Sequence, residues 1–150
     1  MKHYLKLIRV SQWVKNFFVF IPIFFSGNFF NTNLLIESFF GFLIFSFVAS
    51  SIYIINDYVD IKKDQKHPEK KNRPLASGVI TKNNALILFF ALVVITTILI
   101  FLFGNFKVGI IVGVYFLMNL AYSFKLKQIA ILDVMIIAFG FLLRVMVGGY

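Results

Sequence analysis

The stretch LLIESFFGFLIFSFVASSIYIINDYVDIKKD, residues 34–64, decides the fold of this protein. Its first part, residues 34–55, is predominantly apolar and reaches the ~20 residues that a helix needs to cross a bilayer. Three of the six acidic residues of the chain follow directly, within NDYVDIKKD, residues 56–64. The stretch therefore predicts a membrane-spanning helix that runs into an acidic segment at the membrane boundary.

The composition of the whole chain supports this interpretation. Of its 150 residues, 60% are hydrophobic and only 14% are charged, whereas soluble domains have about 25% charged residues. The core of so short a chain cannot bury this much apolar surface, so much of it must face lipid. The absence of cysteine excludes disulfides and thiolate metal sites.

The apolar segments predict an all-α protein, a multi-pass transmembrane helical bundle in which residues 1–150 form one transmembrane unit. The first span is short and is interrupted by Pro22 and Gly27, whereas each of the other four is near the required length. A loop of residues 56–84 separates the second span from the third. The five predicted spans are residues 15–30, 34–55, 85–104, 108–124 and 129–150.

The basic residues predict the orientation in the membrane. A net charge of +9 would also suit nucleic acid, but these charges lie between the spans rather than on one compact face, which argues against a nucleic-acid partner. Segments rich in basic residues face the cytoplasm, and an even number of spans separates the three rich segments. We therefore expect a cell-membrane protein whose N-terminus and loop 56–84 are cytoplasmic. The rich segments contain Lys2, Lys6, Arg9 and Lys15; Lys62, Lys63, Lys66, Lys70, Lys71, Arg73 and Lys82; and Lys125 and Lys127.

The acidic segment has the pattern of a metal site. Asp57, Asp60 and Asp64 are spaced i, i+3 and i+7, which places their carboxylates on one face of a continuous helix. Such a stack repels itself unless a cation lies against it. Hard oxygen ligands suit Mg²⁺, which keeps several waters and is commonly shared with substrate phosphates. The alternative is a solvated helix end with ordinary surface carboxylates. An EF-hand is a poor alternative, because the spacing differs and the central glycine is missing.

A basic loop follows the acidic segment, because two prolines and a glycine interrupt helix in QKHPEKKNRPLASG, residues 65–78. Carboxylates that hold a metal beside cations that hold phosphate oxygens are the arrangement that a Mg²⁺–diphosphate needs. Arg73 is the favoured phosphate ligand, since its planar fork matches phosphate geometry. For each lysine, membrane topology or contact with anionic lipid is the alternative. We expect a structural role for His67 and a helix N-cap at Thr81.

Several motifs of the chain resemble those of the UbiA prenyltransferase superfamily. Residues 56–64 are similar to its first aspartate-rich motif. The segments RPLASG (73–78) and YSFKLK (122–127) are similar to its following arginine-proline segment and to its tyrosine-and-lysine motif. One branch, the decaprenyl-phosphate phosphoribosyltransferases, is most similar, on the basis of RVSQWVKN (9–16), HP (67–68) and GFLLR (140–144).

This resemblance implies a UbiA-type fold, a Mg²⁺ cofactor and a transfer reaction. Phosphoribosyl diphosphate would be the donor, its diphosphate would leave on Mg²⁺, and an oxygen of a polyprenyl phosphate would attack the anomeric carbon. The alternative enzyme is an aromatic prenyltransferase, which would bind a prenyl diphosphate through the same first motif. The alternative of another class is a small cation transporter or a membrane scaffold. A transporter would need carboxylates inside the spans, whereas these cluster at the boundary.

The resemblance also implies roles for individual residues. Asp57, Asp60 and Asp64 would hold Mg²⁺ and Arg73 would hold the leaving diphosphate, so these four would be the catalytic residues. The Tyr122 hydroxyl would donate a hydrogen bond to substrate, with anchoring at the membrane interface as the alternative. The remaining predicted substrate-binding residues are Asn56, Lys15, Lys70, Lys125, Lys127, Asp133 and Arg144.

Asp133 and Arg144 both lie in the fifth span, eleven residues apart, so their side chains should point to similar sides of the helix. Ionisable residues within a span are functional candidates by default. Asp133 is close to the predicted cytoplasmic end and is positioned to serve the site. For Arg144, a functional role and a role in helix packing are equal alternatives.

Members of this superfamily are about twice as long and carry a second aspartate-rich motif, which has no counterpart after Asp64 here. We therefore expect the chain to be part of a longer enzyme, to need a second polypeptide, or to be inactive, and we expect little transfer by the chain alone. The odd number of spans and the ending Gly148-Gly149-Tyr150 favour a truncated chain. Its missing C-terminal half would then be a partner, together with membrane lipids.

Overall fold

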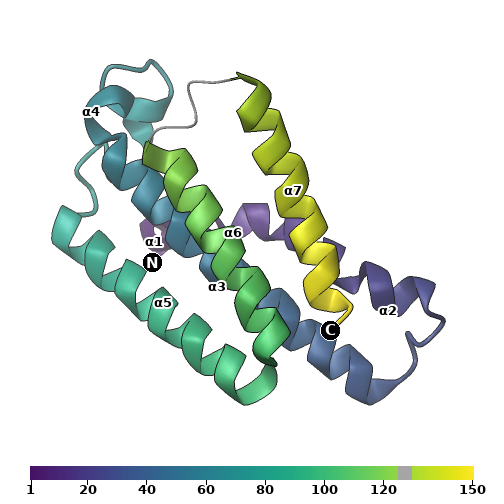
Figure 1. Cartoon of the computed structure of the whole chain (residues 1–150). Helices are drawn as coiled ribbons and strands as arrows, with labels where there is room; N and C mark the ends of the chain where they lie inside the picture. Colours follow the sequence, from purple (N-terminus) through teal and green to yellow (C-terminus); the bar gives the residue numbers. More distant parts are fainter. Residues whose placement is uncertain (125–129) are drawn as a thin grey trace.

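The computed structural model describes residues 1–124 and 130–150, and every regular element in them is helical, so the predicted all-α class is confirmed. The predicted site residues Lys125 and Lys127 lie outside the described residues. Figure 1 shows the chain as a bundle of long helices with short helices at its edges. The elements are α1 (Lys2–Leu7), η1 (Val10–Phe20), α2 (Ile21–Phe25), α3 (Thr32–Val59), α4 (Ile61–Asp64), η2 (Lys70–Asn72), α5 (Lys82–Phe103), α6 (Phe106–Phe124) and α7 (Ala130–Gly148).

Four helices of the described chain, α3, α5, α6 and α7, are long and apolar enough to cross a membrane. They lie where the sequence predicts the second to fifth spans. On α5, large apolar side chains project from one face into the surroundings, as expected of a helix surface that faces lipid. The chain is therefore a multi-pass membrane protein. These exposed residues are Ile87, Phe90, Val94, Ile98 and Phe101.

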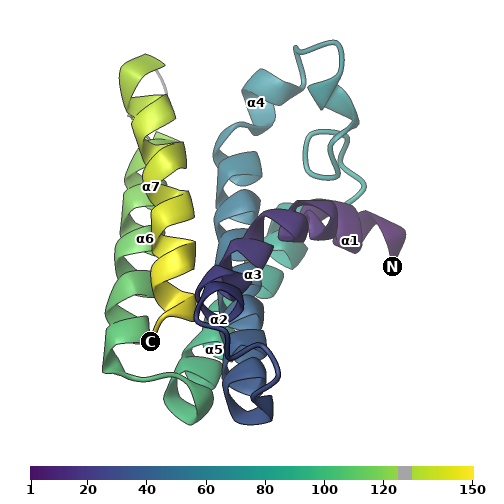
Figure 2. The ribbon, with the colours of Figure 1, turned by 90° about the vertical axis from the view of Figure 1, so that its right-hand side faces the viewer.

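The first predicted span, residues 15–30, differs from the expectation. Its apolar helical segment is Val10–Phe25, which is shorter than the other four and ends before Gly27. Within this segment, η1 is a 3₁₀ helix of 11 residues. A 3₁₀ helix rises ~2.0 Å per residue, so η1 is about 22 Å long, which is longer than an α-helix with the same number of residues. Figures 1 and 2 show η1 and α2 crossing the bundle obliquely.

Helix α3 is the centre of the packing and contacts α5, α6, α7 and η1. Phe45 of α3 is fully buried and packs its ring against Tyr115 of α6, with the two centroids 4.5 Å apart. The first apolar segment approaches α7 very closely: a β-carbon added to Gly148 would overlap the carbonyl oxygen of Val19. Glycine at position 148 is therefore what allows η1 and α7 to touch through their backbones.

The chain segments that carry charge gather at one end of the bundle. Figures 1 and 2 place α4, the end of α6 and the start of α7 at this end. The N-terminal segment joins it, because Nζ of Lys6 donates to the carbonyl of Asn72 in the loop at 3.2 Å. This arrangement agrees with the expectation that an even number of spans separates the basic segments, which puts them on one side of the membrane. The cytoplasmic position of that side stays a prediction.

Candidate functional site

The site is built around one guanidinium group, that of Arg73. Its Nη1 lies 2.8 Å from Oδ2 of Asp64 and 3.1 Å from Oδ1 of Asp57. Asp57 comes from the last turn of α3, Asp64 from the end of α4, and Arg73 from the loop after η2. Two of the three predicted metal ligands thus converge on a single cation.

The backbone brings these carboxylates together in a way that the spacing did not predict. The expectation of one continuous helix through all three aspartates is wrong, since α3 ends at Val59 and α4 begins at Ile61. Asp60 joins them with φ −89° and ψ 4°, outside the helical region, although its N–H still bonds the carbonyl of Asn56. The change of direction at Asp60 brings Asp64 over the end of α3.

Arg9 completes the site and was not among the predicted site residues. Its Nη2 lies 2.6 Å from Oδ1 of Asp57, and its guanidinium also stacks over the ring of Tyr53, 4.6 Å from the centroid. Arg9 has φ 52°, a left-handed conformation that ends α1 and starts η1. The sequence offered one signal for it, its place at the head of the RVSQWVKN segment, but its basic charge was read as membrane topology.

Burial and charge are balanced in this cluster. The side chains of Asp57 and Asp64 are only 3% exposed, whereas those of Arg9 and Arg73 are 27% exposed. Carboxylates buried to this extent require opposite charge and hydrogen bonds. Two carboxylates and two guanidinium groups therefore form a closed ionic cluster with its cationic side toward solvent.

The loop from residue 65 to residue 81 holds Arg73 in place through local hydrogen bonds. The Gln65 side chain donates to the carbonyl of Ala76 at 3.2 Å, and the Ser77 hydroxyl donates to the carbonyl of Arg73 at 2.9 Å. Nδ1 of His67 accepts from the N–H groups of Glu69 and Lys70, which supports a structural role for this histidine. The loop is thus ordered by its own contacts.

The end of the loop is also the start of a helix. Oγ1 of Thr81 accepts from the N–H of Asn84 at 3.2 Å and caps α5, which confirms the predicted N-cap. The side chain of Asn31 caps α3 in the same way.

The donor chemistry of the cluster is compatible with Mg²⁺. Within residues 1–124 and 130–150, no group of three or more His, Cys, Asp or Glu side chains gathers closely enough to hold a metal. Mg²⁺, however, is usually bound through one or two carboxylates, several waters and substrate phosphates. Asp57 and Asp64 offer two carboxylates around a point where a cationic nitrogen already sits.

A second pair of side chains lies at the same end of the bundle. The Tyr122 hydroxyl donates to Oδ1 of Asp133 at 2.6 Å, joining the end of α6 to the first turn of α7. This pair therefore links the two helices at the end of the bundle that also carries the acidic segment.

Three other predicted substrate-binding residues are less closely tied to the cluster. Lys15 is exposed on η1, Lys70 is exposed in η2, and Asn56 is partly buried in the last turn of α3, next to Asp57.

Arg144 lies apart from the ionic cluster, in a network between helices. Its Nε donates to Oδ1 of Asn16 at 2.8 Å, its Nη1 to the carbonyl of Gly140 at 2.7 Å, and its Nη2 to the hydroxyl of Tyr115 at 3.2 Å. Arg144 is 6% exposed. Of the two roles considered for it, these contacts support helix packing. Asp133 and Arg144 both reach tyrosines of α6, in accord with the prediction that they point to similar sides of their helix.

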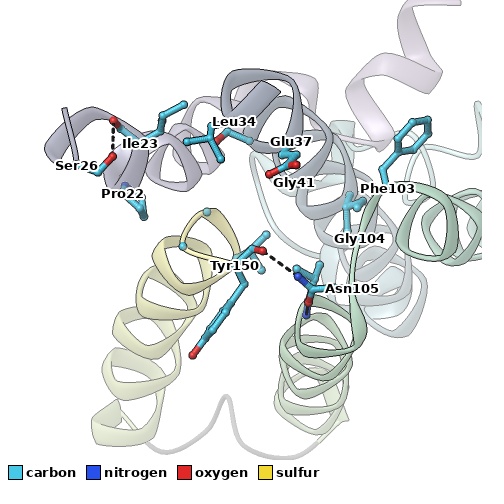
Figure 3. Close-up of a pocket in the computed structure, with 16 residues that line it drawn as sticks. Pro22, Ile23, Ser26, Leu34, Glu37, Gly41, Phe103, Gly104, Asn105 and Tyr150 are labelled. Carbon is cyan, nitrogen blue, oxygen red and sulfur yellow. Dashed lines mark hydrogen bonds between the residues drawn. The ribbon is translucent and has the colours of Figure 1, made fainter. Parts of the chain in front are cut away.

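A pocket of about 450 Å³ lies at the opposite end of the bundle. Figure 3 shows it between α2, the start of α3, the turn from α5 to α6 and the end of α7. The side chain of Asn105 donates there to the carbonyl of Tyr150 at 2.8 Å. Among the described residues that line it, Glu37 has the single carboxylate side chain and none is a lysine or arginine. Without a cationic group this pocket is a poor place for a phosphate.

The sequence and the fold were compared with known proteins. Residues 17–150 match the UbiA prenyltransferase family. The chain is 35% identical over 148 residues to a decaprenyl-phosphate phosphoribosyltransferase of Corynebacterium glutamicum, covering 97% of this chain and 45% of that protein. It is 35% identical over 149 residues to the enzyme of the same name from Mycolicibacterium smegmatis, covering 97% and 46%. The chain spans about half the length of the curated relatives it matches.

The fold has a counterpart among solved structures. A structure reported for digeranylgeranylglyceryl phosphate synthase in membranes superposes with a TM-score of 0.80 and 26% sequence identity, over 99% of this chain and 52% of that one. The helical arrangement described above is therefore similar to half of that protein.

Proposed function

Because the chain belongs to the UbiA prenyltransferase family, we propose that it carries the donor-binding site of a Mg²⁺-dependent membrane transferase. The proposed reaction moves a phosphoribosyl group from phosphoribosyl diphosphate to a polyprenyl phosphate at the cytoplasmic face of the cell membrane. The names of the relatives from Corynebacterium glutamicum and Mycolicibacterium smegmatis support the phosphoribosyl donor. We propose that residues outside this chain take part in the complete enzyme, as the greater length of those relatives indicates.

One observation carries the proposal: Nη1 of Arg73 lies between the carboxylates of Asp57 and Asp64. This arrangement places two hard oxygen ligands and a guanidinium within contact of one another. Carboxylates can hold a divalent cation there, and the guanidinium forks of Arg73 and Arg9 can turn to phosphate oxygens, which they match in geometry. Arg73 thus exchanges a carboxylate partner for a phosphate partner when donor and metal bind.

The chemistry needs no nucleophile from the protein. The bond between the anomeric carbon and the diphosphate oxygen breaks, and its electron pair leaves with the diphosphate. A lone pair of an already ionised oxygen of the polyprenyl phosphate forms the new bond to the same carbon. Bound Mg²⁺ would neutralise the charge that develops on the leaving diphosphate. Asp57, Asp60 and Asp64 would hold this ion, while Arg73 and Arg9 would hold and orient the diphosphate.

The test is a transfer assay with the full natural protein in detergent or nanodiscs. We expect transfer from phosphoribosyl diphosphate to a polyprenyl phosphate in the presence of Mg²⁺ and none after chelation with EDTA. Asp64→Asn should lower kcat/KM by about 100-fold or more, as removal of an electrostatic group at a developing charge does. Glu69→Gln, the same chemical change in the loop outside the cluster, is the matched control.

The runner-up function gives a different result in the same assay. An aromatic prenyltransferase would consume a prenyl diphosphate and an aromatic acceptor and would leave phosphoribosyl diphosphate untouched. That outcome would overturn the phosphoribosyl proposal while keeping the metal–diphosphate site.

A further inference from the structure

Tyr122 and Asp133 form a short hydrogen bond at the end of the bundle that also carries the ionic cluster. The hydroxyl donates to Oδ1 of the carboxylate at 2.6 Å, across the connection between α6 and α7. Both side chains are partly exposed.

Counting protons shows what kind of ligand the pair can bind. The hydroxyl of a phenol carries one proton and can donate one hydrogen bond. In this structure Tyr122 donates that hydrogen bond to Asp133. The Tyr122 oxygen and the second oxygen of Asp133 can then only accept hydrogen bonds. The pair therefore selects a ligand group that donates, such as a hydroxyl, and disfavours phosphate oxygens, which also accept. This differs from the expectation that Tyr122 donates to substrate.

The neighbouring charge points the same way. The Asp133 carboxylate is itself negatively charged and repels the phosphate groups of a ligand. The cationic groups that suit phosphate, Arg73 and Arg9, contact Asp57 and Asp64 instead. This end of the bundle thus has a cationic part beside α4. Between α6 and α7 it has a part whose oxygen atoms can only accept hydrogen bonds.

We infer that Tyr122 and Asp133 bind the hydroxyl groups of the pentose in the sugar diphosphate donor, with Asp133 as the principal acceptor; this inference rests on the proposed function. A carboxylate that accepts from ribose hydroxyls is a common way for proteins to bind this sugar. The diphosphate then lies toward Arg73, and the pentose lies toward α6 and α7. A prenyl diphosphate has no hydroxyl to offer, so the pair also discriminates against prenyl donors.

The experiment compares phosphoribosyl diphosphate with its 2-deoxy and 3-deoxy analogues in the full natural protein. A site built to bind a substrate hydroxyl can reject an analogue that lacks it by about 10⁴-fold, so we expect a preference of at least about 100-fold in kcat/KM for the ribosyl donor over one analogue. Asp133→Asn should reduce turnover of the ribosyl donor strongly and that of the deoxy analogue little, so that the preference shrinks. Tyr122→Phe should shrink it less, and Glu69→Gln should leave it unchanged.

Three outcomes separate this inference from the proposed function. Absence of any phosphoribosyl transfer by the wild-type protein overturns both. Transfer in which the wild-type protein uses the ribosyl donor and both deoxy donors equally well overturns the inference alone. This outcome is measured without any variant, so it does not depend on whether a variant folds. Transfer in which Asp133→Asn reduces all donors equally also overturns it, because the pair would then act on the fold or on the reaction as a whole.

Discussion

Arg9 and Asp57 are 48 residues apart in the chain, yet Nη2 of the arginine lies 2.6 Å from Oδ1 of the aspartate. This contact fastens the N-terminal segment to the last turn of α3. It also leaves Asp57 shared between two guanidinium groups, so the orientation of one proposed metal ligand depends on a residue in the segment before the first apolar helix.

We predict that Arg9→Gln weakens binding of diphosphate in the presence of Mg²⁺ by about 10-fold, because partners that orient ligands typically contribute 10- to 100-fold. Arg9→Lys should retain part of the affinity, since it keeps the charge without the fork. Isothermal titration of the full natural protein with diphosphate and Mg²⁺ measures this. Lys2→Gln is the control, as an exposed cation of the same segment. Equal affinities for Arg9→Gln and Lys2→Gln would remove Arg9 from the site.

Asp60 is expected to be essential for transfer. Asp60→Asn should reduce kcat/KM by about 100-fold or more, since Asp60 is the central carboxylate of the acidic segment. Insertion should be unaffected, because Asp60 lies between α3 and α4, after the end of the apolar helix. The assay is phosphoribosyl transfer, with membrane fractionation of the same variant as the control. Unchanged turnover would show that Asp60 holds neither metal nor substrate.

The contact between Gly148 and Val19 makes a prediction about stability. Gly148→Ala should destabilise the bundle by about 1–3 kcal/mol, as overpacking does, because the new β-carbon would overlap backbone atoms of Val19. Gly113→Ala is the matched change, with nothing within 4 Å of its added β-carbon, and should be neutral or stabilising by up to about 1 kcal/mol. Fluorescence of Trp13, the one tryptophan of the chain and part of η1, follows unfolding in mixed micelles. Equal effects of the two alanines would contradict the close approach.

The buried Arg144 network makes a further stability prediction. Asn16→Ala should cost about 1.5–3 kcal/mol, the contribution of a hydrogen bond to a charged group, because it removes the acceptor of Nε and the donor to Ser46. Asn83→Ala, an exposed change at the start of α5, should stay within about 0.5 kcal/mol. The same unfolding titration compares the two. If Asn16→Ala lowered the stability no more than Asn83→Ala does, the hydrogen-bond donors of Arg144 would be satisfied without Asn16.

Much of the fold could be predicted from local properties of the chain. The long apolar runs predicted helices where α3, α5, α6 and α7 lie, because length and hydropathy alone decide whether a helix can cross a bilayer. Thr81 was recognised as a cap, and two prolines and a glycine marked the loop, because capping and turn formation depend on neighbouring residues only. The clustering of three aspartates marked the end of the bundle where Asp57 and Asp64 contact Arg73.

What the sequence determined by itself was therefore which segments are long and apolar enough to cross a membrane and where acidic and basic side chains collect. Tertiary structure alone decided which of them meet: Arg9 with Asp57, Tyr122 with Asp133, and Arg144 with Asn16, 128 residues away. These pairs depend on how helices cross and on backbone turns at Arg9 and Asp60, and periodicity within one helix carries no information about either. The physical reason is that a hydrogen bond or ion pair forms only within about 3–4 Å, a distance that packing sets and spacing along the chain does not.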